Sequence, residues 1–124
     1  MFTNPDYGLK LEPAQTKSVL ITPNTRSSQF ENKALFSMEF KPLPGTQEEA
    51  NVISKLYTNI NDYNKDKATS QNLLKIKSPK ILHISTHGFF LNDENIENPM
   101  LKSGLAFAGA NMARIKGDSQ GVMT

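Results

Sequence analysis

The sequence predicts an α/β fold, and three observations support this prediction. A short apolar run at residues 81–84, bounded by Pro79 and Gly88, is typical of a strand covered on both faces. Upstream of it, residues 47–57 and 69–78 carry apolar side chains at helical spacing. The resulting order of helix, short strand, helix and strong strand is the alternation expected when helices pack on a sheet.

Length and composition allow one domain with a modest core. Of the 124 residues 37% are hydrophobic, and the formal net charge of +2 comes without a long run of either sign. We therefore expect no nucleic-acid partner and no membrane partner. The start of the chain has no signal-peptide pattern, and no apolar stretch reaches the ~18 residues of a membrane span, so a cytoplasmic location is expected.

The chain divides near residue 42. Residues 1–41 contain scattered turn formers and short apolar pieces such as Val19-Leu20-Ile21, which predict loops around one or two weak strands. Residues 42–124 carry the stronger periodic signals. We interpret the first part as loop-rich and the second as the α/β core part of one incomplete domain over residues 1–124.

The first predicted helix covers about residues 47–57. The segment Thr46-Gln47-Glu48-Glu49 matches a capping box, in which the threonine hydroxyl accepts from a backbone N–H and Glu49 reaches back. One apolar face follows at helical spacing, formed by Ala50, Ile53, Leu56 and Ile60.

Residues 59–63 are predicted to form a short strand and residues 64–66 a turn. A second, shorter helix is expected from Thr69 to before Pro79, because a proline disfavours helical backbone at the residue that precedes it. This helix is expected to turn three apolar side chains inward, those of Leu73, Leu74 and Ile76.

The last third of the chain contains one more clear strand. Residues 92–99 read as a polar, acidic loop, and residues 103–108 as a strand with Leu105 and Phe107 on one face. Residues 109–111 close this strand. Residues 114–120 are predicted to be a polar loop, and residues 121–124 resemble the start of a further element.

The candidate chemistry lies at His87 and Gly88, at the end of the strong strand. An imidazole can act as a base near neutral pH, and a glycine N–H can approach a substrate closely and donate to a developing oxyanion. Two simpler interpretations remain open: a solvent-facing histidine at a strand end, and a glycine that only makes a turn. No nucleophile accompanies the pair, because the chain has no cysteine and no GxSxG.

Other motifs indicate no cofactor and no metal. His83 and His87 have HxxxH spacing, but on a strand they would lie about 13 Å apart, too far to share one ion with ~2 Å bonds. His83 is therefore expected to be a hydrogen-bonded structural histidine. The segment GLAFAGAN lacks the spacing of a phosphate-binding loop, so its small residues are expected to allow close packing.

Three blocks together resemble the CHAT domain family, caspase-like cysteine peptidases often found behind tetratricopeptide repeats. These blocks are FKPLPGTQEEANVI (40–53), SPKILHISTHGFF (78–90) and NPMLKSGLAFAGAN (98–111), with GVMT following the last. NPDYG (4–8) also resembles the segment just after the family's first core strand. The resemblance implies a partial caspase-like three-layer α/β/α sheet, truncated before the strand that carries the nucleophile.

The resemblance also implies roles for two residues: His87 as catalytic histidine and Gly88 as an oxyanion-hole donor. The family's nucleophile is a cysteine at the end of the next core strand, which this sequence does not reach, so the chain is expected to be inactive alone. A peptide or protein substrate and tetratricopeptide repeats upstream are the expected partners. Two alternatives stay open: a non-catalytic peptide- or protein-binding module, and a fragment of an α/β-hydrolase esterase with GxSxG further along.

Overall fold

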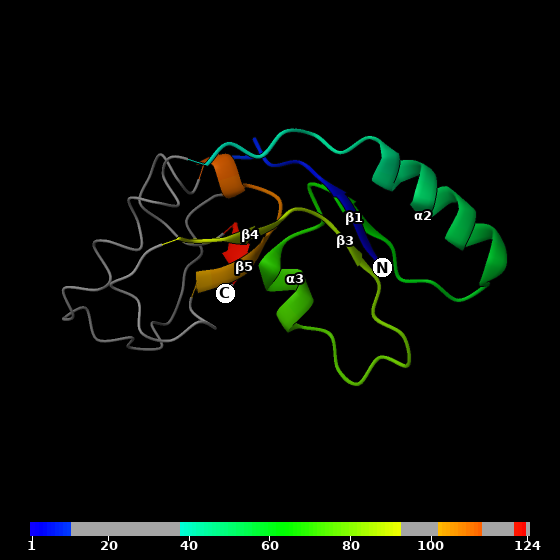
Figure 1. Cartoon of the computed structure of the whole chain (residues 1–124). Coiled ribbons are helices and arrows are strands. Elements are labelled where there is room, and N and C mark those ends of the chain that lie inside the picture. Colours follow the sequence, from blue (N-terminus) through cyan, green and yellow to red (C-terminus); the bar gives the residue numbers. More distant parts are fainter. Residues whose placement is uncertain (11–37, 93–101, 113–120, 124) are drawn as a thin grey trace.

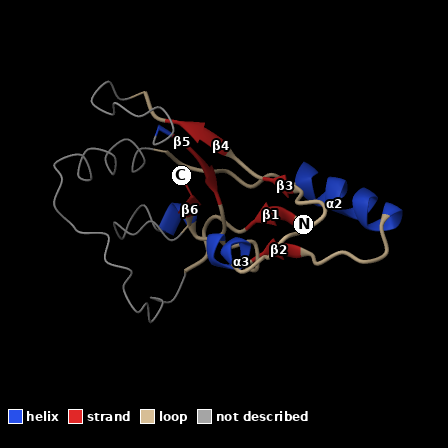
Figure 2. Ribbon diagram, turned by 90° about the horizontal axis from the view of Figure 1, so that it is seen from below, coloured by secondary structure: helices blue, strands red, loops and turns tan. Residues whose placement is uncertain are grey.

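A computed structural model of the chain describes residues 1–10, 38–92, 102–112 and 121–123. In chain order its elements are β1 (Phe2–Pro5), α2 (Gly45–Leu56), β2 (Tyr63–Lys65), α3 (Ser70–Leu74), β3 (Ile84–Ser85), β4 (Gly88–Phe90), β5 (Ser103–Ala106) and β6 (Val122–Met123). They form a parallel sheet in the order β2-β1-β3 and an antiparallel sheet in the order β4-β5-β6 (Figures 1 and 2). The predicted α/β class is confirmed.

The parallel sheet has a helix on each face. Side chains alternate between faces along a strand, so Phe2 and its partner Ile84 point to one side. There they pack in a cluster with Leu73, which lies on α3. On the other side, the hydroxyl of Ser85 donates to the carboxylate of Glu49 on α2, with 2.6 Å between the oxygens. In Figure 1, α2 and α3 accordingly lie on opposite sides of β1.

β1 is the central strand of this sheet, although it belongs to the loop-rich first part of the chain. Its register against β2 shifts between Thr3 and Pro5, where Asn4 has a left-handed backbone with φ of 46°. Asparagine tolerates that conformation better than most residues. The shift turns the Asn4 N–H toward Thr46, whose hydroxyl accepts it at 2.9 Å, so the irregularity also ties β1 to the start of α2.

The first predicted helix is confirmed, but its predicted cap is wrong. α2 begins at Gly45, and no side chain caps its first turn. The Thr46 hydroxyl instead donates to the Leu43 carbonyl at 2.7 Å, and the Glu49 carboxylate bonds Ser85. A local bond of Thr46 to the preceding turn and a tertiary bond of Glu49 to β3 have therefore replaced the two bonds of a capping box. Of the predicted apolar face, Ala50 is buried, whereas Leu56 is 71% exposed.

The second predicted helix is also confirmed, in a shorter form. Thr69 caps α3 by accepting from the Asn72 N–H at 3.1 Å. Leu73 and Ile76 pack inward as predicted, but Leu74 is 76% exposed, so its predicted burial is wrong. A five-residue helix has a narrow contact stripe, and the residue next to Leu73 falls outside it.

The strong strand is divided in two. Residues 84–85 pair with β1 and residues 88–90 with β5, which leaves His87 between the two sheets. The prediction that the preceding apolar run is covered on both faces is wrong, because Ile81 is 70% exposed and Leu82 45% exposed. The reason is the register: β1 pairs from Phe2 onward, opposite Ile84, and its first hydrogen bond reaches only His83, so no β1 residue lies beside Ile81 and Leu82.

β5 confirms the predicted third strand. Leu105 and Phe107 both join the cluster around Phe2, as their spacing predicted, and Gly109 with φ of 86° makes the turn that follows. The element expected near the chain end is β6. Predictions for residues 19–21, 93–99 and 114–120 lie outside the described residues. No helix in the described part of the chain is long and apolar enough to cross a membrane.

Gly104→Ala should destabilise the fold. A Cβ at this position would lie 2.5 Å from Cζ of Phe89 and 2.6 Å from the Met123 carbonyl oxygen, so the Phe89 ring and the backbone of β6 would have to shift. Overpacking of this kind costs about 1–3 kcal/mol, measured as a lower free energy of unfolding in urea.

Gly45→Ala is the matched control, because nothing lies within 4 Å of its added Cβ at the start of α2. It should leave the free energy of unfolding unchanged or raise it by less than about 1 kcal/mol. Equal effects of the two substitutions would contradict the tight contact assigned to Gly104.

Candidate active site

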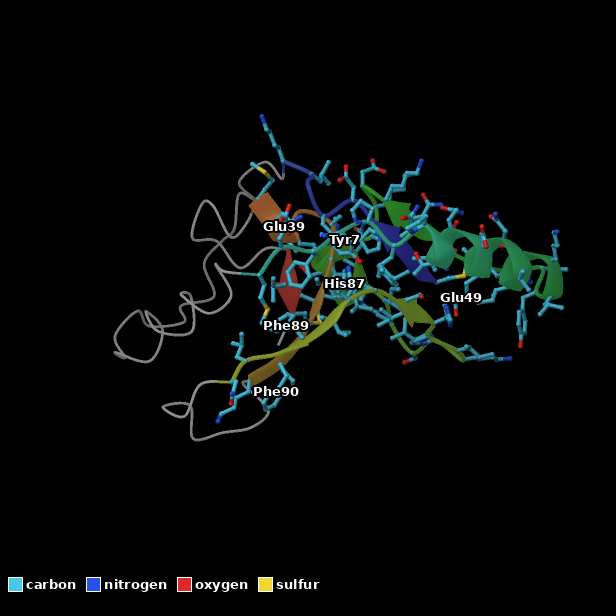
Figure 3. The ribbon with its side chains drawn as sticks, turned by 45° about the horizontal axis from the view of Figure 1, so that its top comes forward. Tyr7, Glu39, Glu49, His87, Phe89 and Phe90 are labelled. Carbon is cyan, nitrogen blue, oxygen red and sulfur yellow. The ribbon has the colours of Figure 1, made fainter. Side chains whose placement is uncertain are left out.

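His87 lies where the chain passes from the parallel sheet to the antiparallel sheet. Its backbone carbonyl accepts from the Ala106 N–H of β5 at 2.9 Å, and its backbone N–H points at the Tyr7 hydroxyl at 3.4 Å. Both bonds hold the backbone at the end of β3. Figure 3 shows Tyr7 and His87 side by side, with Phe90 further along β4.

The imidazole is held by two aromatic rings and one carbonyl. Its ring centre lies 5.3 Å from that of Tyr7 and 5.7 Å from that of Phe40. Nε2 is 2.8 Å from the Lys41 carbonyl oxygen. A carbonyl can only accept, so Nε2 carries the proton and, in the neutral ring, Nδ1 is left as the basic nitrogen.

Tyr7 connects the histidine backbone to β5 through a chain of hydroxyl groups. Its hydroxyl lies 2.9 Å from that of Thr86, which donates to the Ala106 carbonyl. Since the Thr86 proton is already used, Tyr7 donates to Thr86 and accepts from the His87 N–H. Burial of the ring raises the pKa of Tyr7, and its two hydrogen bonds oppose that rise.

Asn111 fixes the segment that carries the Lys41 carbonyl. Its side-chain amide donates to the Phe40 carbonyl at 2.8 Å, and its Oδ1 accepts from the Phe40 N–H at 2.9 Å. The Asn111 backbone N–H also donates to the Tyr7 carbonyl at 2.9 Å. One residue thus positions both neighbours of the His87 ring.

The Gly88 N–H points away from β5. Opposite residues in an antiparallel pair alternate between hydrogen-bonded and non-hydrogen-bonded pairs. Because the Ala106 N–H bonds the His87 carbonyl, the next pair, Gly88 with Leu105, is of the non-bonded kind. The Gly88 amide therefore faces outward beside the imidazole, at an exposed residue.

His83 takes no part in this arrangement. Its Nε2 lies 3.4 Å from Oε1 of Glu49, outside hydrogen-bonding geometry, and that nitrogen is buried without a hydrogen-bond partner. The hydrogen bond expected for His83 is therefore not formed. The two imidazoles of the HxxxH spacing have different neighbours, Glu49 for one and Lys41 for the other.

Several residues of the site could not be found from sequence. Tyr7 lies in NPDYG, and Phe40 and Lys41 lie in FKPLPGT, both of which were noted only for their resemblance. Lys41 contributes its backbone carbonyl, and because every residue has one, the residue type gives no sign of this role. Asn111 carries the one usable signal, since it lies in the turn that Gly109 begins, and asparagine side chains in turns often bond backbone groups.

These features define an α/β protein with a histidine and an outward-facing glycine amide at the junction of two sheets. The chain belongs to the CHAT domain family, whose model matches residues 8–124. The resemblance stated from sequence is thus confirmed, and the family is caspase-like. Neither the curated proteins nor the solved structures contain a match to the chain.

Asn111→Asp should loosen the segment beside the imidazole. The substitution keeps the shape but replaces a donor with a carboxylate oxygen facing the Phe40 carbonyl. Leaving that carbonyl unpaired costs about 1–3 kcal/mol in the free energy of unfolding, measured in urea.

Asn51→Asp on α2 is the same substitution at an exposed residue whose Oδ1 only accepts from Gln47. It should change the free energy of unfolding by less than about 0.5 kcal/mol. A similar cost at both positions would argue against the role given to Asn111.

Tyr7→Phe should change how stability depends on alkaline pH. In the folded state burial raises the pKa of Tyr7 above its ordinary value near 10, so the neutral phenol favours folding. That contribution is complete below pH ~10 and is lost as the pH rises through the raised pKa.

At pH 8 the variant should be less stable than the parent by about 1 kcal/mol, because a hydrogen bond to Thr86 is lost. Above pH ~10 the difference should shrink, since only the parent loses the phenol contribution. Urea unfolding of both proteins at the two pH values measures this. A difference that stays constant or widens would contradict the buried, protonated state of Tyr7.

Proposed function

We propose that this chain supplies the histidine and the oxyanion donor of a caspase-like cysteine endopeptidase. The proposal rests on two adjacent groups. The imidazole of His87 donates its Nε2–H to the Lys41 carbonyl, and the backbone N–H of the next residue, Gly88, points outward from the sheet. Family membership supports the same reaction class.

His87 is the proposed general base. With Nε2–H engaged by Lys41, Nδ1 is the nitrogen that would take the proton of a thiol and later return it to the leaving amine. The aromatic rings of Tyr7 and Phe40 restrict ring rotation, so the basic nitrogen keeps one direction. No metal or organic cofactor is part of the proposed reaction.

Gly88 is the proposed donor to the oxyanion of the tetrahedral intermediate. Its N–H is not used by the β4–β5 ladder, so it is free to bond the oxygen that becomes negative during attack. Because the base and the donor belong to adjacent residues, a carbonyl carbon under attack can lie close to both of them.

The thiol must come from outside these 124 residues, which contain no cysteine. Phe2 donates to the His83 carbonyl, so alternate residues of β3 face β1 and Ile84 faces the other edge. That edge, which has no partner strand among the described elements, suits a further strand with a cysteine at its end.

A second candidate is a binding module of the same fold that holds a peptide or protein without cutting it. The absence of cysteine favours it if the encoded protein has none elsewhere. Reading the gene past the codon for Thr124 separates the two, since the peptidase requires a strand ending in cysteine.

Gly88→Pro should strongly reduce turnover in the encoded protein that unites these residues with the cysteine strand. Proline removes the donor N–H but breaks no ladder bond, so kcat for peptide hydrolysis should fall about 10²-fold or more.

Gly88→Ala is the matched control. It keeps the N–H, and its added Cβ would meet only ordinary contacts at 3.9 and 4.0 Å. Its turnover should stay within about threefold of the parent, because the donor is retained. Equal activity of the proline variant and the parent would refute the role proposed for Gly88.

A further inference from the structure

A pocket lies at the end of the parallel sheet that is opposite to His87. Its volume is about 510 Å³, within the range of about 300–1,000 Å³ that is usual for small-molecule sites. Met1 and His83 line it, and they directly precede β1 and β3, whereas His87 lies beyond the other end of β3. β3 therefore runs between this pocket and the proposed active site.

The walls of the pocket are mainly aliphatic and come from segments far apart in sequence. They are built by α2 and the residues after it, by the residue pair of turns that follows α3, and by the run before β3. The large apolar lining residues are Ile53, Tyr57, Ile60, Ile76, Ile81 and Leu82. Tyr57, Ile81 and Leu82 are 54%, 70% and 45% exposed. Large apolar side chains exposed together around a hollow are typical of a ligand or interaction site.

The charge at the pocket has one sign. Among the described residues that line it, Lys80 has the only side chain with a fixed charge, and none is an aspartate or glutamate. Lys80 is exposed and forms no ion pair with any described residue. At the other polar lining residue of interest, His83, Nε2 lies 3.4 Å from Oε1 of Glu49, so an anion there would meet a like charge. An anionic group is therefore favoured beside Lys80.

We propose that this pocket binds an amphiphilic anion in which an unbranched aliphatic chain ends in a carboxylate. The chain lies among the aliphatic side chains, where each methylene removed from water contributes to affinity. The carboxylate stays at the exposed Lys80, where it keeps part of its hydration while it pairs with the ammonium group. Tyr57 is the one aromatic ring among the described lining residues, so a stacked planar ligand has less support.

The first test compares three ligands on the unchanged chain. Decanoate is the probe, used below the concentration at which it forms micelles, and the amide NMR shifts of residues 80–83 and α2 should change and saturate. Butyrate keeps the carboxylate but has a much shorter chain, so it should bind at least about 100-fold more weakly. Decyltrimethylammonium keeps the chain but reverses the charge, so it should bind at least about threefold more weakly.

The second test uses two matched pairs of variants at exposed residues. Ile81→Asn should weaken decanoate binding about fivefold or more, whereas Leu74→Asn, at a 76% exposed leucine that does not line the pocket, should change it less than about twofold. Lys80→Gln should weaken binding about threefold, and Lys77→Gln, also outside the pocket, less than about twofold. If a variant fails to fold, the three ligands on the unchanged chain decide the matter.

Several results would overturn the proposal. These are the absence of saturable decanoate binding, equal affinity for butyrate, and equal losses in Ile81→Asn and Leu74→Asn. Another occupant would also overturn it: sedimentation of the chain with phosphatidylglycerol vesicles would indicate a bilayer, an apolar hexapeptide that displaces decanoate would indicate a polypeptide, and a dimer that Ile81→Asn dissociates would indicate a second copy. None of these measurements involves His87 or Gly88, so their outcome is independent of the proposed function.

Discussion

The alternation of peptide groups along residues 83–90 is the constraint from which the site follows. One edge of this segment is occupied by β1 and then by β5, and every second residue turns its N–H and C=O toward that edge. The residues between them must face the other way. His87 falls on the inner set and Gly88 on the outer set. The backbone of the histidine is therefore anchored, while the amide beside it stays available.

Anchoring the backbone alone would leave the ring free to turn, and a second layer of contacts prevents this. Asn111 bonds both backbone groups of Phe40, and the adjoining Lys41 carbonyl accepts a hydrogen bond from the imidazole Nε2–H. Tyr7, just after β1, accepts from the backbone N–H of the same histidine and donates a hydrogen bond to Thr86. Three segments far apart in sequence thus determine which nitrogen is basic. The residues around the His87 ring therefore cannot be identified from their position in the sequence relative to His87.

The fold could be predicted where local patterns and tertiary packing agree. The helix at α2, the second helix that starts near Thr69 and the face shared by Leu105 and Phe107 follow from the periodicity and the proline that ends the second helical pattern. The failures have physical causes: Thr46 found partners outside its helix, and the apolar run around Ile81 depended on strand pairing that begins only opposite Phe2. For the site, the sequence indicated His87 and Gly88. The Lys41 carbonyl and the two-bond contact of the Asn111 amide with Phe40 produce no pattern of residue types that could have predicted them.

The proposed mechanism depends on which ring nitrogen of His87 carries the proton, and the hydrogen bond to the Lys41 carbonyl places it on Nε2. Nitrogen-15 NMR of the histidine rings measures its position directly, at a pH of about 8.5 where an ordinary imidazole is neutral. The structure predicts that His87 is protonated at Nε2 and bare at Nδ1. A His87 ring protonated at Nδ1, or one that averages between the two tautomers, would contradict the base assigned to this site.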